Sequence, residues 1–317
     1  MWLFTLYTQP SGWVCFIVQA FKQLNKRKEI TMTSQAMTIM IQGTASNVGK
    51  SLIAAGLCRV FHNRGLKVAP FKAWNMSSNS YLTEDNIEIG IGQTIQAIAA
   101  GCRPDVKFHP VLVKPLGDGK TELYLNGIRQ GQYQFGDSDH QLNLKINEAI
   151  NKSLDILKSE FDLIIFEGSG SPVELNRVGP DFGNMFAARL NNTPVFLTAD
   201  ISRGGALADL VGTLKLLSSE DRNLVKGLII NKFRGDFELL KPGLDFLEKY
   251  TGKQVLGTVP YLQKVNLPEE DTSPHLQLDQ STDLTYLEEE IENIAQQLEE
   301  SLQIDSILNL ARRDRNG

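Results

Sequence analysis

Cysteine is scarce in this sequence, and no long basic run occurs in it. The three cysteines, Cys15, Cys58 and Cys102, lie far apart, which excludes a disulfide framework and a Cys-x-x-Cys metal site. This usage is typical of a reducing compartment, and we expect a cytoplasmic protein. The formal net charge of −5 also disfavours a surface built mainly for nucleic acid, so we expect no nucleic-acid partner.

The overall composition is that of an ordinary globular protein. Of the 317 residues, 42% are hydrophobic and 22% are charged, which excludes a disordered, collagen-like or multi-span membrane protein. A chain of this length can bury a sizeable core without disulfides. The length fits either two domains or one α/β domain with appendages.

Residues 1–36 form a separate segment. Residues 1–21 carry no charge and Lys22 begins a basic stretch after them, whereas a secretory signal needs its positive charge before the apolar stretch. Polar residues, Pro10 and Gly12 interrupt the apolar character that a membrane-spanning helix requires. We therefore expect residues 1–36 to be a leader or a mis-started extension, with a disordered arm or an anchor as alternatives.

Short apolar runs alternate with helical patterns from Thr38 onward. The expected strands are 38–41, 67–71, 163–166, 195–198, 228–230 and 255–259, and the expected helices are 50–63, 88–100 and 141–159. This alternation predicts a doubly wound, mostly parallel α/β sheet covered on both faces, in one domain over 37–273. Ligands in such sheets bind at the carboxyl ends of the strands.

The tail, residues 274–317, has a different pattern. Apolar residues recur in it at spacings of three and four, at Leu284, Leu287, Ile291, Ile294 and Leu298. This spacing predicts an amphipathic helix of about four turns that docks on the parent domain. The alternative is a self-association seam, which would make the protein a homodimer.

A glycine-rich loop follows the first expected strand and precedes the first expected helix. It reads Gly-Thr-Ala-Ser-Asn-Val-Gly-Lys-Ser over 43–51, with one residue more between its glycines than the usual phosphate loop. Backbone N–H groups in such a loop surround phosphate oxygens, and the helix N-terminus adds partial positive charge. Lys50 would reach the β- and γ-phosphates, and the Ser51 hydroxyl would ligate Mg²⁺. The expected nucleotide-binding residues are Gly43, Thr44, Asn47, Val48, Gly49, Lys50 and Ser51.

Charged residues at the ends of three other expected strands complete the candidate site. Glu167 ends the third expected strand and is placed to hold Mg²⁺. Lys72 ends the second, where it can neutralise charge on a transferring phosphoryl group. Asp200 and Arg203 follow the fourth and could bind metal, phosphate or a substrate carboxylate, with a helix-capping role as the alternative.

Eight segments, taken in order, give the chain a resemblance to the cobyric acid synthase family over roughly residues 37–273. They are IQGTASNVGKS (41–51), FKAWNMSSNS (71–80), EIGIGQ (88–93), HPVLVKP (109–115), FEGSGSPVELN (166–176), TADISRGG (198–205), GLIINKFRGD (227–236) and VPYLQKVNLPEED (259–271). The similarity is to the family's ATP-dependent amidation domain, a dethiobiotin-synthetase-like phosphate-loop fold.

The resemblance implies a ligase that amidates peripheral carboxylates of a corrin precursor, converting cobyrinic acid a,c-diamide to cobyric acid. A carboxylate is a poor electrophile at neutral pH, so ATP first converts it to an acyl phosphate, from which ammonia displaces phosphate. The protein would supply positioning and charge neutralisation through Lys50, Lys72 and Mg²⁺.

The resemblance also implies roles for individual residues. Asn231 and Pro260 would lie beside the adenine, and Glu88 is a further metal candidate beside Ser51 and Glu167. The residues expected to face the corrin are Asn75, Ser169, Ser171 and Asn176. The sequence departs from the family pattern at Trp74, at Ile91-Gly92 and at His109, and we expect His109 to be structural.

The family normally continues into a glutaminase domain, in which a histidine activates a cysteine nucleophile. Neither Cys58 nor Cys102 has such a context, and residues 304–311 resemble the linker helix that closes the ATPase domain of related corrin amidases. We therefore expect no intrinsic glutaminase activity, and ammonia from a separate glutaminase subunit or from solution.

Three other interpretations stay open. A dethiobiotin-synthetase-like carboxylase would use the same sheet, although the NMSSNS, DISRGG and KFRGD segments favour the corrin branch. A partner-switching ATPase would carry an additional lysine early in the phosphate loop, where Thr44 and Ala45 stand. A domain that binds nucleotide and regulates a partner without turnover is the third.

Overall fold

A six-stranded parallel sheet lies at the centre of the unit formed by residues 36–317. The structure, a computed structural model, describes residues 36–117, 120–134, 139–176, 179–262, 265, 267, 268, 277–279 and 281–313. The strands are β1 (Met37–Gly43), β2 (Val68–Phe71), β9 (Leu163–Glu167), β10 (Val195–Asp200), β11 (Val225–Phe233) and β12 (Gln254–Pro260). Their spatial order is β12-β11-β10-β1-β9-β2, and every residue of β1, β2, β9 and β10 is buried. The predicted doubly wound, mostly parallel α/β sheet is confirmed.

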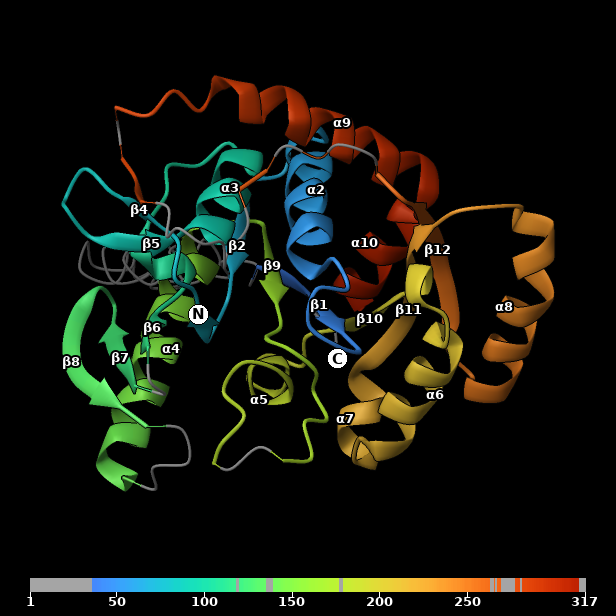
Figure 1. The fold of residues 1–317 in the computed structure, drawn as a ribbon, viewed down its shortest axis with the longest axis horizontal. Helices are drawn as coiled ribbons and strands as arrows, with labels where there is room; N and C mark the ends of the chain where they lie inside the picture. The colour runs from blue at the N-terminus through green and yellow to red at the C-terminus, as the bar shows by residue number, and fades with distance from the viewer. Residues whose placement is uncertain are drawn as a thin grey trace, which may run out of the picture. The chain divides into compact units, whose positions relative to one another are not determined.

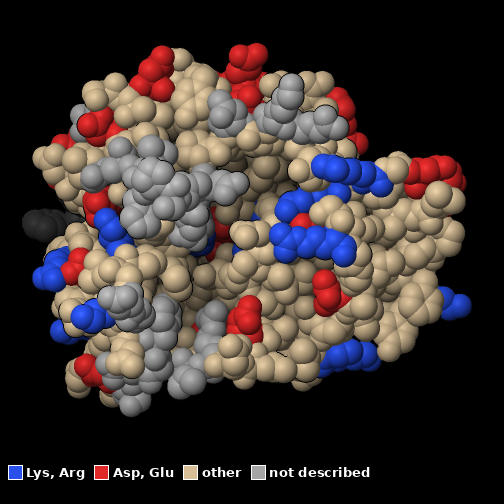
Figure 2. All heavy atoms as spheres, in the orientation of Figure 1, with Lys and Arg blue, Asp and Glu red and all other residues tan. Residues whose placement is uncertain are grey.

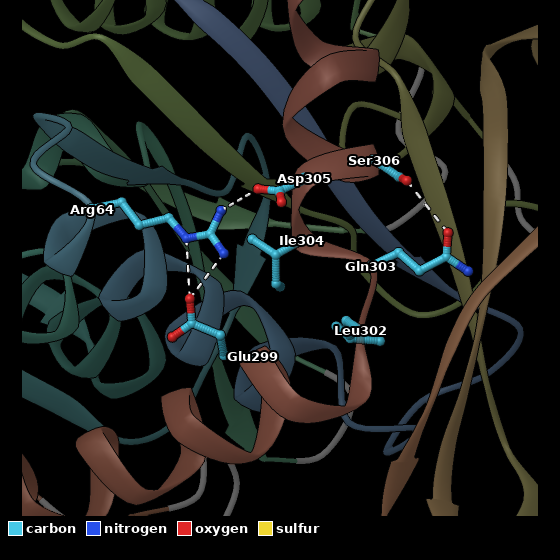
Figure 3. A pocket seen from close by; sticks show the side chains of 7 residues that line it. All are labelled: Arg64, Glu299, Leu302, Gln303, Ile304, Asp305 and Ser306. Atoms are coloured by element: carbon cyan, nitrogen blue, oxygen red, sulfur yellow. Dashed lines mark hydrogen bonds and ion pairs between the residues drawn. The ribbon is translucent and has the colours of Figure 1, made fainter.

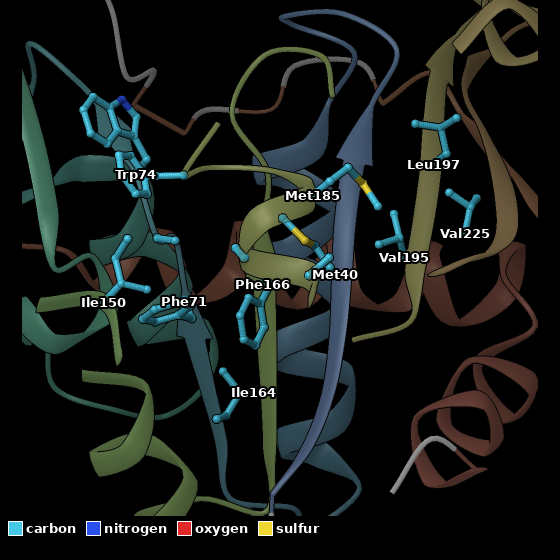
Figure 4. Packing of buried hydrophobic residues seen from close by; sticks show 14 of the residues in the cluster. Met40, Phe71, Trp74, Ile150, Ile164, Phe166, Met185, Val195, Leu197 and Val225 are labelled. Carbon is cyan, nitrogen blue, oxygen red and sulfur yellow. The ribbon is translucent and has the colours of Figure 1, made fainter. Parts of the chain in front are cut away.

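Helices cover both faces of this sheet (Figure 1). One face carries α2 (Lys50–Asn63), α3 (Ile91–Ala99), α9 (Thr285–Ser301) and α10 (Ile304–Arg313). The other carries α4 (His140–Glu160), α5 (Met185–Arg189), α6 (Ala206–Leu216), α7 (Ser219–Leu224) and α8 (Phe237–Thr251). Because successive strand residues point to opposite faces, Ile39 and Ile41 enter the first core and Met40 the second. Figure 4 shows the second core, where Met40 and Phe166 lie beside Met185 of α5.

Two smaller sheets were not predicted. One has the order β3-β6-β7-β8, with β3 (Asn75–Met76), β6 (Val111–Gly117), β7 (Lys120–Leu125) and β8 (Ile128–Tyr133). The other has the order β13-β4-β5, with β13 (Gln277–Leu278), β4 (Ser80–Leu82) and β5 (Glu88–Gly90). The predicted helix over 88–100 is therefore wrong at its start, because residues 88–90 pair with β4 and α3 begins at Ile91.

The tail folds back on the same unit. Leu287, Ile291, Ile294 and Leu298 of α9 are buried, and α9 packs along α2. The predicted docking is confirmed, and it occupies the apolar stripe that a self-association seam would have used. The predicted leader lies outside the described residues except for Ala36, as does the predicted domain boundary at 273 and 274.

Ion pairs reinforce this docking at the C-terminal end of α2. Arg64 binds Glu299 at 2.9 Å and Asp305 at 2.6 Å, so one guanidinium joins α2 to both tail helices. The turn between these helices borders a polar pocket of about 300 Å³ (Figure 3). The pocket lies at the opposite end of α2 from the glycine-rich loop. None of the helices in the described part of the chain is long and apolar enough to cross a membrane.

A glycine in α2 makes the close packing of α9 possible. A Cβ atom at Gly56 would lie 2.4 Å from Leu298 Cδ1 and 2.8 Å from Ile294 Cγ2. We therefore expect Gly56→Ala to lower the free energy of unfolding by about 1–3 kcal/mol, measured in urea, because it overpacks the interface. Gly212→Ala in α6 is the matched control. Its Cβ would meet no atom within 4 Å, so the variant should be neutral or more stable, and equal losses in both variants would contradict the packing argument.

Candidate functional site

The carboxyl ends of the parallel strands bring most of the predicted site residues to one edge of the sheet. The loop after β1 carries the glycine-rich sequence, and Lys72, Glu167 and Asp200 stand at the ends of β2, β9 and β10. Asn231 and Pro260 occupy the ends of β11 and β12. This edge is where ligands bind in doubly wound sheets.

The loop between β1 and α2, which was predicted to bind phosphate, is held in shape by glycine geometry and by hydrogen bonds. Gly49 has a φ of +99°, and a Cβ atom there would lie 2.1 Å from Asn231 Nδ2, so only glycine fits. The Thr44 N–H donates to the Thr198 carbonyl at 2.9 Å, which anchors the loop to β10. Lys50 is buried, and its Nζ donates to the Ala45 carbonyl at 2.9 Å, so the amine lies over the loop.

Two residues at the end of β11 hold the loop from the other side. Asn231 Nδ2 donates to the Val48 carbonyl at 2.8 Å, and Lys232 Nζ donates to the Asn47 carbonyl at 2.7 Å. Lys232 also pairs with Asp200 Oδ2 at 2.8 Å. Figure 2 shows Lys and Arg side chains gathered near the ends of β10 and β11. Their positive charge favours an anion at this edge.

Glu167 is the centre of a buried polar network. Its Oε1 accepts from Ser51 Oγ at 2.6 Å and lies 3.2 Å from Lys72 Nζ. Its Oε2 accepts from Gln96 Nε2 at 2.6 Å and from Gln93 Nε2 at 3.4 Å. The Lys72 and Glu167 side chains are only 4% and 1% exposed, so the ion pair is held away from water. Strands β2 and β9 and helices α2 and α3 thus converge on one carboxylate.

The surroundings keep this carboxylate ionised. Burial alone would raise the pKa of Glu167, but the charge of Lys72 and the hydrogen bonds from Ser51 and Gln96 lower it below the ordinary glutamate value. The same lysine acts on His109, whose pKa is lowered to about 3 by burial and by Lys72. His109 is therefore neutral at pH 7. Its Nε2 accepts from the Gly90 N–H at 3.1 Å, which fixes the residue that precedes α3.

The pH dependence of stability should report the Glu167 network. Because its pKa is lower in the folded chain, Glu167 stabilises the fold above about pH 4.3, and this contribution disappears as the pH falls toward the folded value. We expect the stability difference between the wild type and Glu167→Gln to be larger at pH 7 than at pH 3.5, measured by urea unfolding. Parallel pH profiles for the two proteins would contradict the assigned ion pair.

Asp200 and Arg203 differ in how far their side chains are exposed to solvent. Asp200 is buried and accepts from the Ser202 N–H at 2.9 Å, which is the capping role that sequence left open. Burial would raise the pKa of Asp200, but its bonds with Lys232 and Ser202 lower it. Arg203 is 72% exposed, and its Nε is 3.8 Å from Asp200 Oδ2. Arg203 can therefore reach a ligand that approaches from solvent.

The predicted metal candidates separate into two groups. Ser51 and Glu167 contact each other and offer hydroxyl and carboxylate oxygens, which are the ligands Mg²⁺ prefers beside nucleotide phosphates. Glu88 lies on β5 instead, pairs with Lys114 at 2.7 Å and accepts from Ser80 Oγ at 3.3 Å. No three His, Cys, Asp or Glu side chains gather as a metal site among the described residues. The residues present fit a Mg²⁺ ion that is held jointly by protein and nucleotide.

The predicted corrin-facing residues lie on two segments. Ser169, Ser171 and Asn176 belong to the loop after β9, in which Asn176 is exposed. Asn184 holds this loop, because its Nδ2 donates to the Ser169 carbonyl at 2.7 Å and its Oδ1 accepts from the Ser169 N–H at 2.9 Å. Asn75 lies on β3, where its Nδ2 donates to Gln93 Oε1 at 2.6 Å.

Sequence reasoning missed four residues that shape this site: Gln93, Gln96, Asn184 and Lys232. The two glutamines carry a signal in the sequence, because they are large polar residues three positions apart in a mostly apolar helix, so they share one face. Asn184 and Lys232 carry no such signal, since their partners are distant in the chain.

Comparison with known proteins finds one matching family model and relatives with closely similar sequences. A family model described as the CobQ/CobB/MinD/ParA nucleotide binding domain matches residues 39–274. The cobyric acid synthase of Moorella thermoacetica is 48% identical over 237 residues, which are 75% of this chain and 46% of that protein. The cobyric acid synthase of Carboxydothermus hydrogenoformans is 50% identical over 237 residues, 75% of this chain and 48% of that protein.

The chain thus spans about half the length of the curated relatives it matches. Among solved structures, the MinD cell division protein of Aquifex aeolicus is similar with a TM-score of 0.42 and 14% identity, covering 89% of this chain and 98% of that one. A score this low adds nothing to the family match.

Proposed function

The chain belongs to the CobQ/CobB/MinD/ParA nucleotide-binding domain family, and on this premise we propose that it amidates peripheral carboxylates of a corrin precursor using ATP. The proposed substrate is cobyrinic acid a,c-diamide and the proposed product is cobyric acid. The observation that carries the proposal is the convergence of Ser51, Lys72 and the buried Glu167 beside the phosphate loop. The identity of 48–50% to cobyric acid synthases supports the choice of substrate.

The phosphate loop would bind the nucleotide through its backbone N–H groups. Lys50, which lies over the loop, would exchange the Ala45 carbonyl for a β- or γ-phosphate oxygen. Ser51 and Glu167 would hold Mg²⁺, which neutralises phosphate charge when bound. Asn231 and Pro260, at the ends of neighbouring strands, would flank the adenine.

Transfer of the γ-phosphoryl group to a substrate carboxylate would give an acyl phosphate, from which ammonia displaces phosphate. The chain contributes positioning and charge rather than a covalent nucleophile. Lys72 is fixed by Glu167, so its ammonium would meet the transferring phosphoryl group with little reorganisation. Arg203, exposed at the same edge, would bind phosphate or a substrate carboxylate, and Asp200 would keep Lys232 against the loop.

The corrin would approach from the side of Asn75 and of the loop with Ser169, Ser171 and Asn176. Asn184 would hold that loop in shape through its bonds to Ser169 and Ser171. Free ammonium can supply ammonia in an assay, so the proposal can be tested without a glutaminase partner.

The test is an amidation assay with purified protein, Mg-ATP, ammonium and cobyrinic acid a,c-diamide, followed by mass spectrometry of the corrin. We expect successive products, each differing by the mass change from carboxylic acid to amide, that appear only with ATP. A parallel reaction offers the dethiobiotin precursor with bicarbonate. A product in that reaction alone, or tight ATP binding without any corrin product, would contradict the proposal.

A further inference from the structure

A chain of two side-chain amides leads away from Glu167 and ends in a buried oxygen to which no described residue donates a hydrogen bond. Gln93 Nε2 donates to Glu167 Oε2 at 3.4 Å, and Asn75 Nδ2 donates to Gln93 Oε1 at 2.6 Å. Asn75 is fully buried, yet its Oδ1 has no hydrogen-bond partner among the residues that the structure describes. Most buried polar atoms in folded proteins have a hydrogen-bond partner, so this oxygen is a candidate acceptor for an N–H or O–H group of a ligand.

The direction of this chain of amides follows from the charge of Glu167. An ionised carboxylate only accepts hydrogen bonds, so Gln93 must turn its NH₂ group toward Glu167 and its carbonyl toward Asn75. That carbonyl in turn requires the NH₂ group of Asn75. The oxygen of Asn75 is therefore fixed as a free acceptor, because rotating the amide would place two oxygens against each other.

Neighbouring residues hold this acceptor in place. A Cβ atom at Gly90 would lie 2.3 Å from Asn75 Nδ2, so Asn75 packs directly on that glycine. The Gly90 N–H is bound by His109, which is neutral and buried. Asn75 also follows Lys72 by three residues, on the segment that leaves the end of β2. The acceptor is thus rigid and belongs to the same network as the phosphoryl-handling residues.

We propose that Asn75 Oδ1 is the binding subsite for the ammonia nucleophile, from which it accepts one N–H hydrogen bond. This inference rests on the proposed function. A lone acceptor suits an N–H donor and disfavours the phosphate and carboxylate oxygens of the other two reactants. An accepted N–H bond restricts the position of ammonia and leaves its lone pair, which points away from the N–H groups, available to attack the acyl carbon.

The step is balanced with the reactants already named. The ammonia nitrogen attacks the acyl carbon, a C–N bond forms, and the bond from that carbon to the bridging oxygen breaks. The electron pair of the broken bond leaves with phosphate, which also takes the additional proton from nitrogen. Asn75 orients the nucleophile and is unchanged.

The experiment measures KM separately for ammonium, ATP and the corrin in the wild type, Asn75→Leu and Asn75→Ser. Thr94→Val is the control, because Thr94 lies in the same helix as Gln93 and its hydroxyl donates to the Gly90 carbonyl, with no hydrogen bond to Asn75 or Glu167 among the described residues. We expect KM for ammonium to rise about tenfold in the Asn75 variants, the value of one hydrogen bond, while KM for ATP stays within about twofold. Asn75→Ser keeps a smaller polar group at this position, so it can be measured if the Asn75→Leu variant does not fold.

Each of the other outcomes contradicts either the ammonia subsite alone or the proposed amidation activity as well. An active wild type whose Asn75 variants keep the normal KM for ammonium overturns the inference alone. A rise in KM for the corrin, with KM for ammonium unchanged, assigns the oxygen to a substrate amide and also overturns it. If KM rises equally for ammonium, ATP and the corrin, both in the Asn75 variants and in Thr94→Val, Asn75 has only a structural role and the inference is overturned. A wild type without amidation activity overturns the proposed function and the inference together.

Discussion

Lys50→Ala is expected to lower the rate of ATP-dependent amidation by at least about 10²–10³-fold while the fold is retained. Lys50 follows Gly49, whose left-handed backbone turns the chain into α2, and its buried amine already lies over the loop on the Ala45 carbonyl. A phosphate in the loop would take over that bond. Loss of the amine would therefore remove a fixed positive charge from the place where negative charge would develop in the proposed phosphoryl transfer.

The matched measurement compares Lys50→Ala with Lys145→Ala, which removes an exposed lysine from α4. Amidation rate and urea unfolding should be followed for both proteins. The control should keep its rate, and both variants should unfold cooperatively. A Lys50 variant that stays within a few-fold of the wild-type rate would mean that the loop does not act on the transferring phosphoryl group.

Lys72→Met is expected to lose both activity and about 3–5 kcal/mol of stability, because it leaves the buried charge of Glu167 without its cation. Lys72→Met combined with Glu167→Gln should regain much of that stability, since the pair is then removed together. It should not regain activity, because the proposed phosphoryl-neutralising ammonium and the metal-holding carboxylate are both gone.

Urea unfolding of the wild type, the two single variants and the double variant gives the coupling free energy of the pair. Activity measured on the same four proteins separates function from stability. Additive losses in the double variant would contradict a direct buried interaction between Lys72 and Glu167. Recovered activity in the double variant would contradict the roles proposed for both residues.

The six central strands could be predicted because each contains a short apolar run, and four of them are buried along their whole length. Strand ends also placed Glu167, Lys72 and the phosphate loop at one edge, since parallel strands share the direction of their carboxyl ends. The small sheets escaped prediction because β6, β7 and β8 are partly exposed and the other four strands, β3, β4, β5 and β13, are only two or three residues long. One signal existed there, the Asn126-Gly127 pair, whose φ values of +48° and +78° form the turn between β7 and β8.

The hydrogen-bonding shell around the site was harder to predict. Glu167 meets Gln96 from 71 residues away and Ser51 from 116 residues away, and nothing local in the sequence encodes such a contact. The contact of His109 with Gly90 was equally hard to predict, because it depends on how β5 and the segment before β6 come together. Its expected structural role fits its buried ring and the hydrogen bond that the ring accepts from the Gly90 N–H.

In the proposed reaction, this chain activates a substrate carboxylate by phosphorylating it. The most direct test uses a corrin precursor labelled with ¹⁸O in its carboxylates, together with Mg-ATP and ammonium, and analyses the phosphate released. One ¹⁸O atom is expected in the phosphate for each amide formed, because the bridging oxygen of the acyl phosphate comes from the carboxylate. Unlabelled phosphate released alongside amide product would contradict this reaction.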